Sequence, residues 1–195
     1  MNLTDKKLPL VAVVNTALCN EPTIEFLLQF ADEYIKERVK RLVSLQDKAN
    51  SVVGCVLRKW IIKRVFGVDF DAQKIEFESF GKPYLKGQNQ IHFNISHSGE
   101  MVVCAVHDKP VGVDVQKITE YRPKVAQYIF DKEEQAQLDA SKDKDRTFTS
   151  LWSQKESKIK LLGCGVSGHK GKSFDGIKTT CTEQNGYIIS LSVYE

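Results

Sequence analysis

Residues 151–163 are Leu-Trp-Ser-Gln-Lys-Glu-Ser-Lys-Ile-Lys-Leu-Leu-Gly, the pattern of a helix with an apolar side and a glycine at its end. Glu156 and Lys160 are four residues apart and therefore share one helical face. We expect Lys155 to lie on the same polar stripe. One acid among cations suits a bound metal and an anionic ligand, while an ordinary Glu–Lys pair on a surface helix is the alternative that this segment leaves open.

The composition is that of a globular protein that can bury a sizeable core. The chain has 195 residues, 42% of them hydrophobic and 27% charged. A net charge of +3 is too small to indicate a nucleic-acid partner. No apolar run approaches the ~20 residues needed to cross a bilayer, and the first residues lack a secretory pattern. These features predict a cytoplasmic protein with no membrane and no nucleic-acid partner.

The cysteines are odd in number, widely spaced, and form no C-x-x-C pair. Several lie within apolar runs, which indicates small reduced core residues rather than disulfide partners, zinc ligands or nucleophiles. The five are Cys19, Cys55, Cys104, Cys164 and Cys181.

The first third of the chain predicts one strand followed by helices. Residues 10–14 are uniformly apolar, which predicts a strand buried on both faces. Helical periodicity covers residues 23–34, and residues 35–41 are strongly basic. A long helix from Ser44 or Gln46 to about residue 66 then ends at a glycine.

The remainder predicts strands, helices and strands again. The predicted strands are 74–80, 90–98, 101–107, 111–115, 173–180 and 182–195, the last pair near an Asn185-Gly186 hairpin turn. The predicted helices are 125–129, 132–140 with Asp131 as N-cap, and 148–162, with a loop at 141–145. This order predicts an α+β fold of two halves, residues 1–108 and 109–195, that meet near Lys109-Pro110.

Asp114 lies in the middle of the apolar strand at Val113-Asp114-Val115. A buried carboxylate without a partner is costly, so this side chain requires a cation or several hydrogen-bond donors. A strand-end aspartate bonded to backbone amides is the alternative. Asp114 and Glu156 together would form a two-carboxylate magnesium site that phosphate oxygens complete.

The segment Asn94-Ile95-Ser96-His97-Ser98 offers hydroxyls, an amide and an imidazole, which suit phosphate binding. A serine hydrolase that uses Ser96 and His97 fails on geometry, because adjacent strand residues point to opposite faces. The G-x-S-x-G elbow of many such hydrolases is also absent from the sequence.

Five segments in order give the chain a specific resemblance. They are Gly81-Lys82-Pro83, Phe93-Asn94-Ile95-Ser96-His97-Ser98-Gly99, Gly112-Val113-Asp114-Val115, Phe130-x-x-x-Glu134 and Trp152-Ser153-x-Lys155-Glu156-Ser157-x-Ile159-Lys160. The chain resembles a 4′-phosphopantetheinyl transferase of the surfactin-synthetase-activating (Sfp) type, most closely over residues ~80–165.

The resemblance implies an enzyme that binds coenzyme A and Mg²⁺ between two similar α+β halves. Such a monomeric enzyme moves the phosphopantetheine arm to a serine of an apo acyl or peptidyl carrier protein and releases adenosine 3′,5′-bisphosphate. The first half would contact the nucleotide, and the second would carry the metal site and catalytic helix. Because the carrier is typically acidic, we expect Lys124, Lys132 and the adjoining helix to form its docking face.

The resemblance also assigns residues to roles. Asp114 and Glu156 would hold the metal, Glu156 would accept the serine proton, and Lys160 would stabilise or protonate the leaving phosphate. The expected coenzyme A contacts are Lys155 at the pyrophosphate, Ser96 and His97 at the phosphates, Lys82 near the adenine, and Arg38, less surely Lys36, at the 3′-phosphate with Ser51 nearby.

Three positions depart from the family pattern. Gln116 stands where a third acidic ligand is frequent, Asn50 where an arginine beside the adenosine is usual, and Cys164 where a lysine is usual. Glu134 matches a further family glutamate that would order water or a loop. An amide at position 116 can still coordinate the metal but lowers the negative charge of the site. A weakened binding module that holds coenzyme A or a carrier without transfer therefore stays the alternative.

Overall fold

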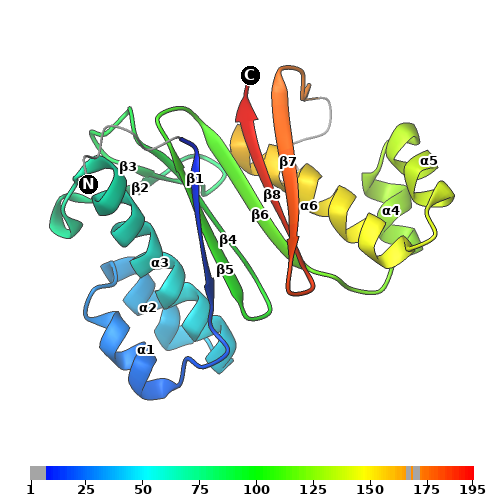
Figure 1. Cartoon of the computed structure of the whole chain (residues 1–195). Coiled ribbons are helices and arrows are strands. Elements are labelled where there is room, and N and C mark those ends of the chain that lie inside the picture. The colour runs from blue at the N-terminus through cyan, green and yellow to red at the C-terminus, as the bar shows by residue number, and fades with distance from the viewer. Residues whose placement is uncertain (1–7, 166–167, 169–171) are drawn as a thin grey trace.

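The computed structural model describes residues 8–165, 168 and 172–195. Two three-stranded antiparallel sheets form the centre of an α+β molecule, with helices on the outer sides (Figure 1). The α+β class predicted from the sequence is confirmed. No helix within these residues is long and apolar enough to cross a membrane.

The N-terminal half begins with a strand and three helices. These are β1 (Leu10–Asn15), α1 (Glu21–Leu28), α2 (Glu33–Arg41) and α3 (Leu45–Phe66). The predicted single helix over residues 23–34 is wrong, because α1 ends at Leu28. A separate helix, α2, begins after its N-cap residue Asp32. Ser44, one of the two predicted starting points, caps α3, and Gly67, with φ of 74°, ends the helix as predicted.

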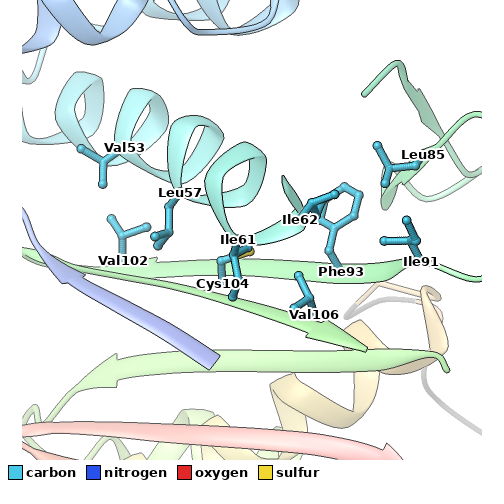
Figure 2. Packing of buried hydrophobic residues seen from close by; sticks show 10 residues of the cluster. All are labelled: Val53, Leu57, Ile61, Ile62, Leu85, Ile91, Phe93, Val102, Cys104 and Val106. Atoms are coloured by element: carbon cyan, nitrogen blue, oxygen red, sulfur yellow. The ribbon is translucent and has the colours of Figure 1, made fainter. Parts of the chain in front are cut away.

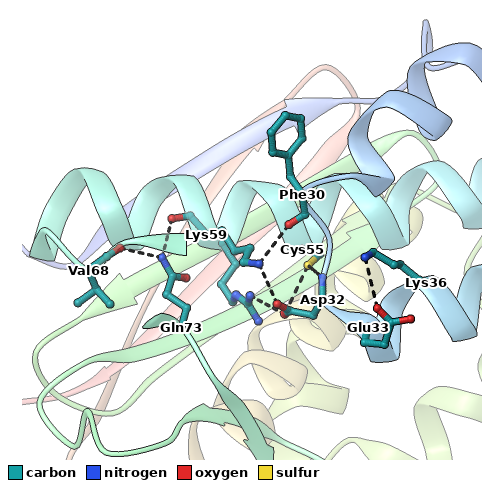
Figure 3. Close-up of polar contacts among 9 residues, drawn as sticks. Phe30, Asp32, Glu33, Lys36, Cys55, Lys59, Val68 and Gln73 are labelled. Atoms are coloured by element: carbon teal, nitrogen blue, oxygen red, sulfur yellow. Dashed lines mark hydrogen bonds and ion pairs between the residues drawn. The ribbon is translucent and has the colours of Figure 1, made fainter. Parts of the chain in front are cut away.

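The helix break has a tertiary cause. The Asp32 carboxylate forms ion pairs with Arg58 at 2.6 Å and Lys59 at 2.9 Å, both on α3 (Figure 3). Lys59 also donates to the Phe30 carbonyl at 3.1 Å. These contacts fix the connection between α1 and α2 against α3, so long-range pairing overrides the local helical pattern.

The first sheet has the order β1-β5-β4, with β4 spanning His92–Ser98 and β5 spanning Met101–His107. The sequence predicted β4, β5 and the tight turn between them. β1 is an edge strand with Val13 36% exposed, so the prediction that it is buried on both faces is wrong. A short hairpin, β2 (Ile75–Phe77) and β3 (Pro83–Leu85), lies apart from this sheet.

Strand β5 contributes to two cores because it is buried on both faces. Alternate side chains pack against α3, as Figure 2 shows for Val102, Cys104 and Val106. The others pack against the second sheet, namely Met101, Val103 and Ala105 against Val111, Val113, Val115, Tyr187 and Ile189. The molecule is therefore layered as helix, sheet, sheet and helix.

The second sheet has the order β6-β8-β7. Its strands are β6 (Val111–Lys117), β7 (Ile177–Gln184) and β8 (Tyr187–Tyr194). Asn185 and Gly186 have φ of 52° and 77°, which confirms the predicted hairpin turn. The sequence predicted one strand that ends at residue 180 and another that starts at residue 182. This boundary is wrong, because β7 continues through Cys181 to Gln184.

Three helices complete the C-terminal half: α4 (Pro123–Ile129), α5 (Lys132–Ala140) and α6 (Lys144–Leu162). Asp131 and Glu134 form the capping box that starts α5, which confirms the predicted N-cap. The predicted loop 141–145 extends too far, and the helix predicted to start at residue 148 starts earlier. Asp143 caps α6, which begins at Lys144.

All five cysteines are free thiols. Cys55, Cys104 and Cys164 are buried and Cys19 is half-buried, as a reduced core residue should be. Burial raises the pKa of the Cys104 thiol to about 12. Cys181 is exposed, so the core prediction is wrong at this position.

Candidate active site

Asp114 is the polar centre where the two halves meet. Its side chain is 1% exposed. Oδ1 accepts hydrogen bonds from Lys160 Nζ at 2.7 Å and Ser96 Oγ at 2.9 Å, and Oδ2 accepts from Gln116 Nε2 at 3.1 Å. The expectation that this carboxylate needs a cation and donors is confirmed, and the strand-end alternative is excluded.

The approach of α6 to β6 depends on a glycine. A Cβ at Gly112 would lie 2.0 Å from the Ser157 carbonyl oxygen and 2.5 Å from the Leu161 backbone nitrogen, both on α6. Contacts this short require the backbone to move, so only glycine permits the observed packing. The close approach places Lys160 within reach of Asp114, two residues beyond the glycine on the strand.

Strands β4 and β6 are joined by side chains instead of backbone pairing. Three small polar residues of β4 face β6, at every second position, and each accepts a backbone N–H. The bonds are Asn94 Oδ1 from Val113 at 2.9 Å, Ser96 Oγ from Val115 at 3.3 Å and Ser98 Oγ from Lys117 at 3.1 Å. We call these three bonds the β4–β6 ladder. Sequence reasoning missed it, although the Asn-x-Ser-x-Ser alternation is its signal.

A cleft of about 230 Å³ opens beside this centre, and its walls come from both halves. Glu156 and Lys160 line it from α6, and Lys82 and Asn94 line it from the N-terminal half. Lys82 Nζ donates to the Leu161 carbonyl at 2.9 Å, near the end of α6. Burial holds the pKa of Lys82 below its usual range, although nearby Glu78 opposes this shift.

Lys155 lies outside this cleft. Its ammonium donates to Glu134 Oε2 at 2.5 Å and to the Ile129 carbonyl at 2.9 Å, and it lies over the Phe130 ring. It is five positions before Lys160, so the two side chains point about 140° apart around the helix. The expectation of one polar stripe is therefore wrong: Lys155 ties α6 to α4 and α5, while Glu156 and Lys160 face the cleft.

Two basic residues of α2, Lys36 and Arg38, lie on different faces of the helix. Arg38 is exposed and acts electrostatically on His97. Lys36 pairs with Glu33 at 3.3 Å and lines a different groove, between α1, α2 and α3, so the structure does not bring it to Arg38. Partial desolvation, then Arg38 and Lys160, lower the pKa of His97.

Asn50 and Ser51, two neighbouring polar residues of α3, are both buried. Asn50 donates to the Gly99 carbonyl at 2.9 Å and accepts from Thr16 Oγ1 at 2.9 Å and from Gln46 at 2.9 Å. It therefore holds the β4–β5 turn, a role that the sequence did not indicate. Ser51 beside it is also buried, at 9% exposure.

The donor set fits Mg²⁺ only in part. Across the described ranges, no three or more His, Cys, Asp or Glu side chains form a metal-binding group. Mg²⁺ is usually held by one or two carboxylates, with substrate phosphates and water as the other ligands. Asp114 and Glu156 supply two such carboxylates. Gln116 turns its amide nitrogen to Asp114, and a half-turn of the amide would present its oxygen instead.

Comparisons with known proteins agree with this architecture. The family model "4′-phosphopantetheinyl transferase, N-terminal" matches residues 19–109, and the model "4′-phosphopantetheinyl transferase superfamily" matches residues 110–193. The chain belongs to the 4′-phosphopantetheinyl transferase superfamily.

Individual relatives specify the branch. The chain is 35% identical to 4′-phosphopantetheinyl transferase Sfp of Bacillus subtilis (strain 168) over 146 residues, which are 73% of this chain and 65% of Sfp. It is 34% identical to 4′-phosphopantetheinyl transferase psf-1 of Bacillus pumilus over 146 residues, 74% of this chain and 63% of the relative. The Sfp type is thereby confirmed. The chain spans less than two thirds of the length of these relatives.

Proposed function

We propose that this chain transfers the 4′-phosphopantetheine arm of coenzyme A to a serine of an apo acyl or peptidyl carrier protein. One observation carries the proposal: the buried Asp114–Lys160 pair lies beside a cleft that Glu156 lines, in a chain of this superfamily. Phosphoryl transfer needs mainly positioning and charge neutralisation, and this arrangement can supply both.

The reaction assigns different roles to two neighbouring side chains of α6. The carrier serine oxygen forms a bond to the phosphorus that bears the pantetheine arm, and the bond from that phosphorus to the bridging oxygen breaks. Glu156 accepts the serine proton, and Lys160 stabilises or protonates adenosine 3′,5′-bisphosphate as it leaves. Glu156 and Lys160 are one helical turn apart on the cleft side, which suits action at the two ends of one transfer.

Asp114 and Glu156, with Gln116 as a third ligand, would hold Mg²⁺. The metal would neutralise the charge of the pyrophosphate. Because position 116 is an amide, we expect weaker metal binding than a third carboxylate would give.

The nucleotide contacts would come mainly from residues 1–108, and the metal site and catalytic helix from residues 109–195. Arg38 and His97 are the best supported phosphate contacts, because the two lie close enough to interact. Lys82 lines the cleft and suits the nucleotide end. Lys36, Ser51 and Lys155 are weaker candidates, since each is buried or paired elsewhere.

The carrier protein would dock on α4 and α5, where Lys124 and Lys132 provide positive charge for an acidic partner. Tyr128 of α4 is 70% exposed and adds apolar area to the same face. We propose that the enzyme works as a monomer in the cytoplasm, because a single chain supplies both walls of the cleft.

Intact-mass analysis of an apo acyl carrier protein tests the proposal. Incubation with the protein, coenzyme A and Mg²⁺ should add one phosphopantetheine arm, and a chelator should prevent the gain. Coenzyme A binding without transfer to fatty-acid or peptidyl carriers would favour the binding module instead. Gln116→Glu would then be the first variant to restore transfer.

A further inference from the structure

We propose that Tyr187 is a positioning residue that fixes the turn between β4 and β5 and so strengthens the binding of coenzyme A. The inference rests on the proposed function, because the expected phosphate contacts Ser96 and His97 lie near the end of β4, just before this turn. Tyr187 belongs to the other half of the molecule and would act through the turn, without touching the ligand.

The turn at Gly99-Glu100 is held from the N-terminal half through its carbonyl groups. Asn50 donates to the Gly99 carbonyl at 2.9 Å. Thr16 donates twice to the Glu100 carbonyl, from its backbone N–H at 2.7 Å and from its hydroxyl at 3.0 Å. These bonds fix the turn against β1 and α3, which belong to the same half as β4.

Tyr187 holds the same turn from the C-terminal half. The Glu100 N–H donates to the Tyr187 hydroxyl at 3.2 Å. Tyr187 begins β8 and pairs with Lys117 of β6, and its ring packs with Met101 in the core between the two sheets. Because the residue is only 5% exposed, the contact should persist when a ligand occupies the cleft.

The turn and the hydroxyl of Tyr187 fit closely. Gly99 has φ of 52°, and a Cβ at this position would lie 2.7 Å from the hydroxyl oxygen. The next nearest atoms, Lys117 Cδ and Tyr187 Cε1, would both lie at an ordinary contact distance of 3.6 Å. Among the described residues, the hydroxyl is therefore the one group that a methyl group at Gly99 would have to displace.

A turn that is bonded from both halves has one position relative to the cleft. Loss of the hydroxyl would leave the bonds to Asn50 and Thr16 in place but would free the turn from the C-terminal half. The change should appear in the binding of coenzyme A, because β4 carries proposed phosphate contacts directly before the turn. The groups proposed to act in the chemical step, Glu156 and Lys160, lie on α6 instead.

The kinetic test uses Tyr187→Phe, which removes the hydroxyl and keeps the ring. The KM for coenzyme A should rise by about 3–10-fold, as for the loss of one hydrogen bond. The kcat and the KM for the carrier should stay within about twofold, since binding and not the chemical step is affected. Tyr194→Phe removes an exposed hydroxyl from the other end of β8 and should leave all three constants unchanged.

A double-mutant cycle with Gly99→Ala tests the contact itself. In the wild type the added methyl group meets the hydroxyl, whereas in Tyr187→Phe it has room. Gly99→Ala should therefore raise the KM for coenzyme A, and lower the denaturation midpoint, more in the wild type than in Tyr187→Phe. The two KM ratios should differ by at least about twofold. The strain of a positive φ is the same in both backgrounds and cancels.

Two results would overturn the inference. One is a Tyr187→Phe variant with an unchanged KM for coenzyme A, even if its stability falls, because the hydroxyl would then be only structural. The other is an equal effect of Gly99→Ala in both backgrounds. A wild-type chain that transfers nothing would instead overturn the proposed function. Calorimetric titration with coenzyme A and the denaturation cycle would still report whether Tyr187 and the turn are coupled.

Discussion

Among the described residues, two aspartates form ion pairs in the interior, one in each half. Asp32 binds Arg58 and Lys59 in the N-terminal half (Figure 3), and Asp114 binds Lys160 in the C-terminal half. Both pairs join elements that are distant in sequence. Their cations differ in exposure, and that difference separates a structural pair from the pair that we propose to be functional.

The cations of Asp32 are withdrawn from solvent. The side chains of Arg58 and Lys59 are 0% and 9% exposed. Burial alone would raise the pKa of Asp32, but Arg58 and Lys59 hold it below the usual value. Lys160, in contrast, is 27% exposed and lines the cleft while its partner Asp114 is 1% exposed. A buried carboxylate with a cation that reaches solvent is suited to meet a ligand.

The largest expected effect tests the functional pair. Asp114→Ala should lower the transfer rate by at least about 100-fold, because it removes both a proposed metal ligand and the partner of Lys160. The fold should persist, since Lys160 can turn its ammonium to solvent. Intact-mass assays and circular dichroism measure the two outcomes. If the variant transfers at the wild-type rate, Asp114 has no role in transfer, and the two aspartates do not differ in function.

Disruption of the Asp32 ion pairs should lower the stability of the protein and leave its activity unchanged. Asp32→Asn should lower the free energy of unfolding by about 3–5 kcal/mol, because it leaves two buried cations without their anion. The kcat of the folded fraction should not change. Chemical denaturation measures the loss, and Glu37→Gln, which breaks the exposed pair with Lys40, is the control that should change little.

The ion pairs of Asp32 should also make the stability of the protein depend on pH. Because the folded-state pKa of Asp32 is lowered, its stabilisation is present above the unfolded pKa of about 4 and is lost as the pH falls through the folded value. The gap in stability between wild type and Asp32→Asn should therefore narrow below pH ~4. If the difference in stability stays constant at lower pH, the charge of Asp32 is not what stabilises the wild type.

A smaller effect should follow from Gly112→Ala. The added methyl group would meet the backbone of α6, and overpacking of this kind costs about 1–3 kcal/mol. The helix should shift away from β6 and separate Lys160 from Asp114, so kcat should fall with stability. Loss of stability with unchanged kcat would show that the pair tolerates a displaced helix.

The smallest effect concerns His97. Its lowered pKa means that the folded protein favours the neutral imidazole, so stability rises with pH between the folded value and about 6.5. Wild type should therefore lose melting temperature relative to His97→Asn as the pH falls from 7.5 to 5.5, and the two should differ least at high pH. The reverse trend would place an anion, not Arg38 and Lys160, beside the ring.

Local signals in the sequence predicted much of this fold. Ser44 and Gly67 marked the ends of α3, Asp131 marked the start of α5, and Asn185-Gly186 marked the last turn. These features act through neighbouring backbone groups, and they need no knowledge of the tertiary structure.

Long-range partners account for what the sequence could not show. Helical spacing placed Glu156 and Lys160 on one face, but the direction of Lys155 depends on Glu134, which lies on another helix. Likewise, the break before α2 depends on Asp32 reaching α3, and the hydrogen bond of Ser96 to Val115 depends on β6 lying beside β4. Asp114 was predictable because its apolar neighbours made an unpaired charge improbable.

Strand β5 also has a consequence for folding cooperativity. By chain position it belongs with the N-terminal half, yet every second side chain completes the hydrophobic core of the C-terminal half. A chain divided between residues 108 and 109 would leave one fragment with an uncovered strand face and the other without part of its core. Heat should consequently melt both halves in a single transition.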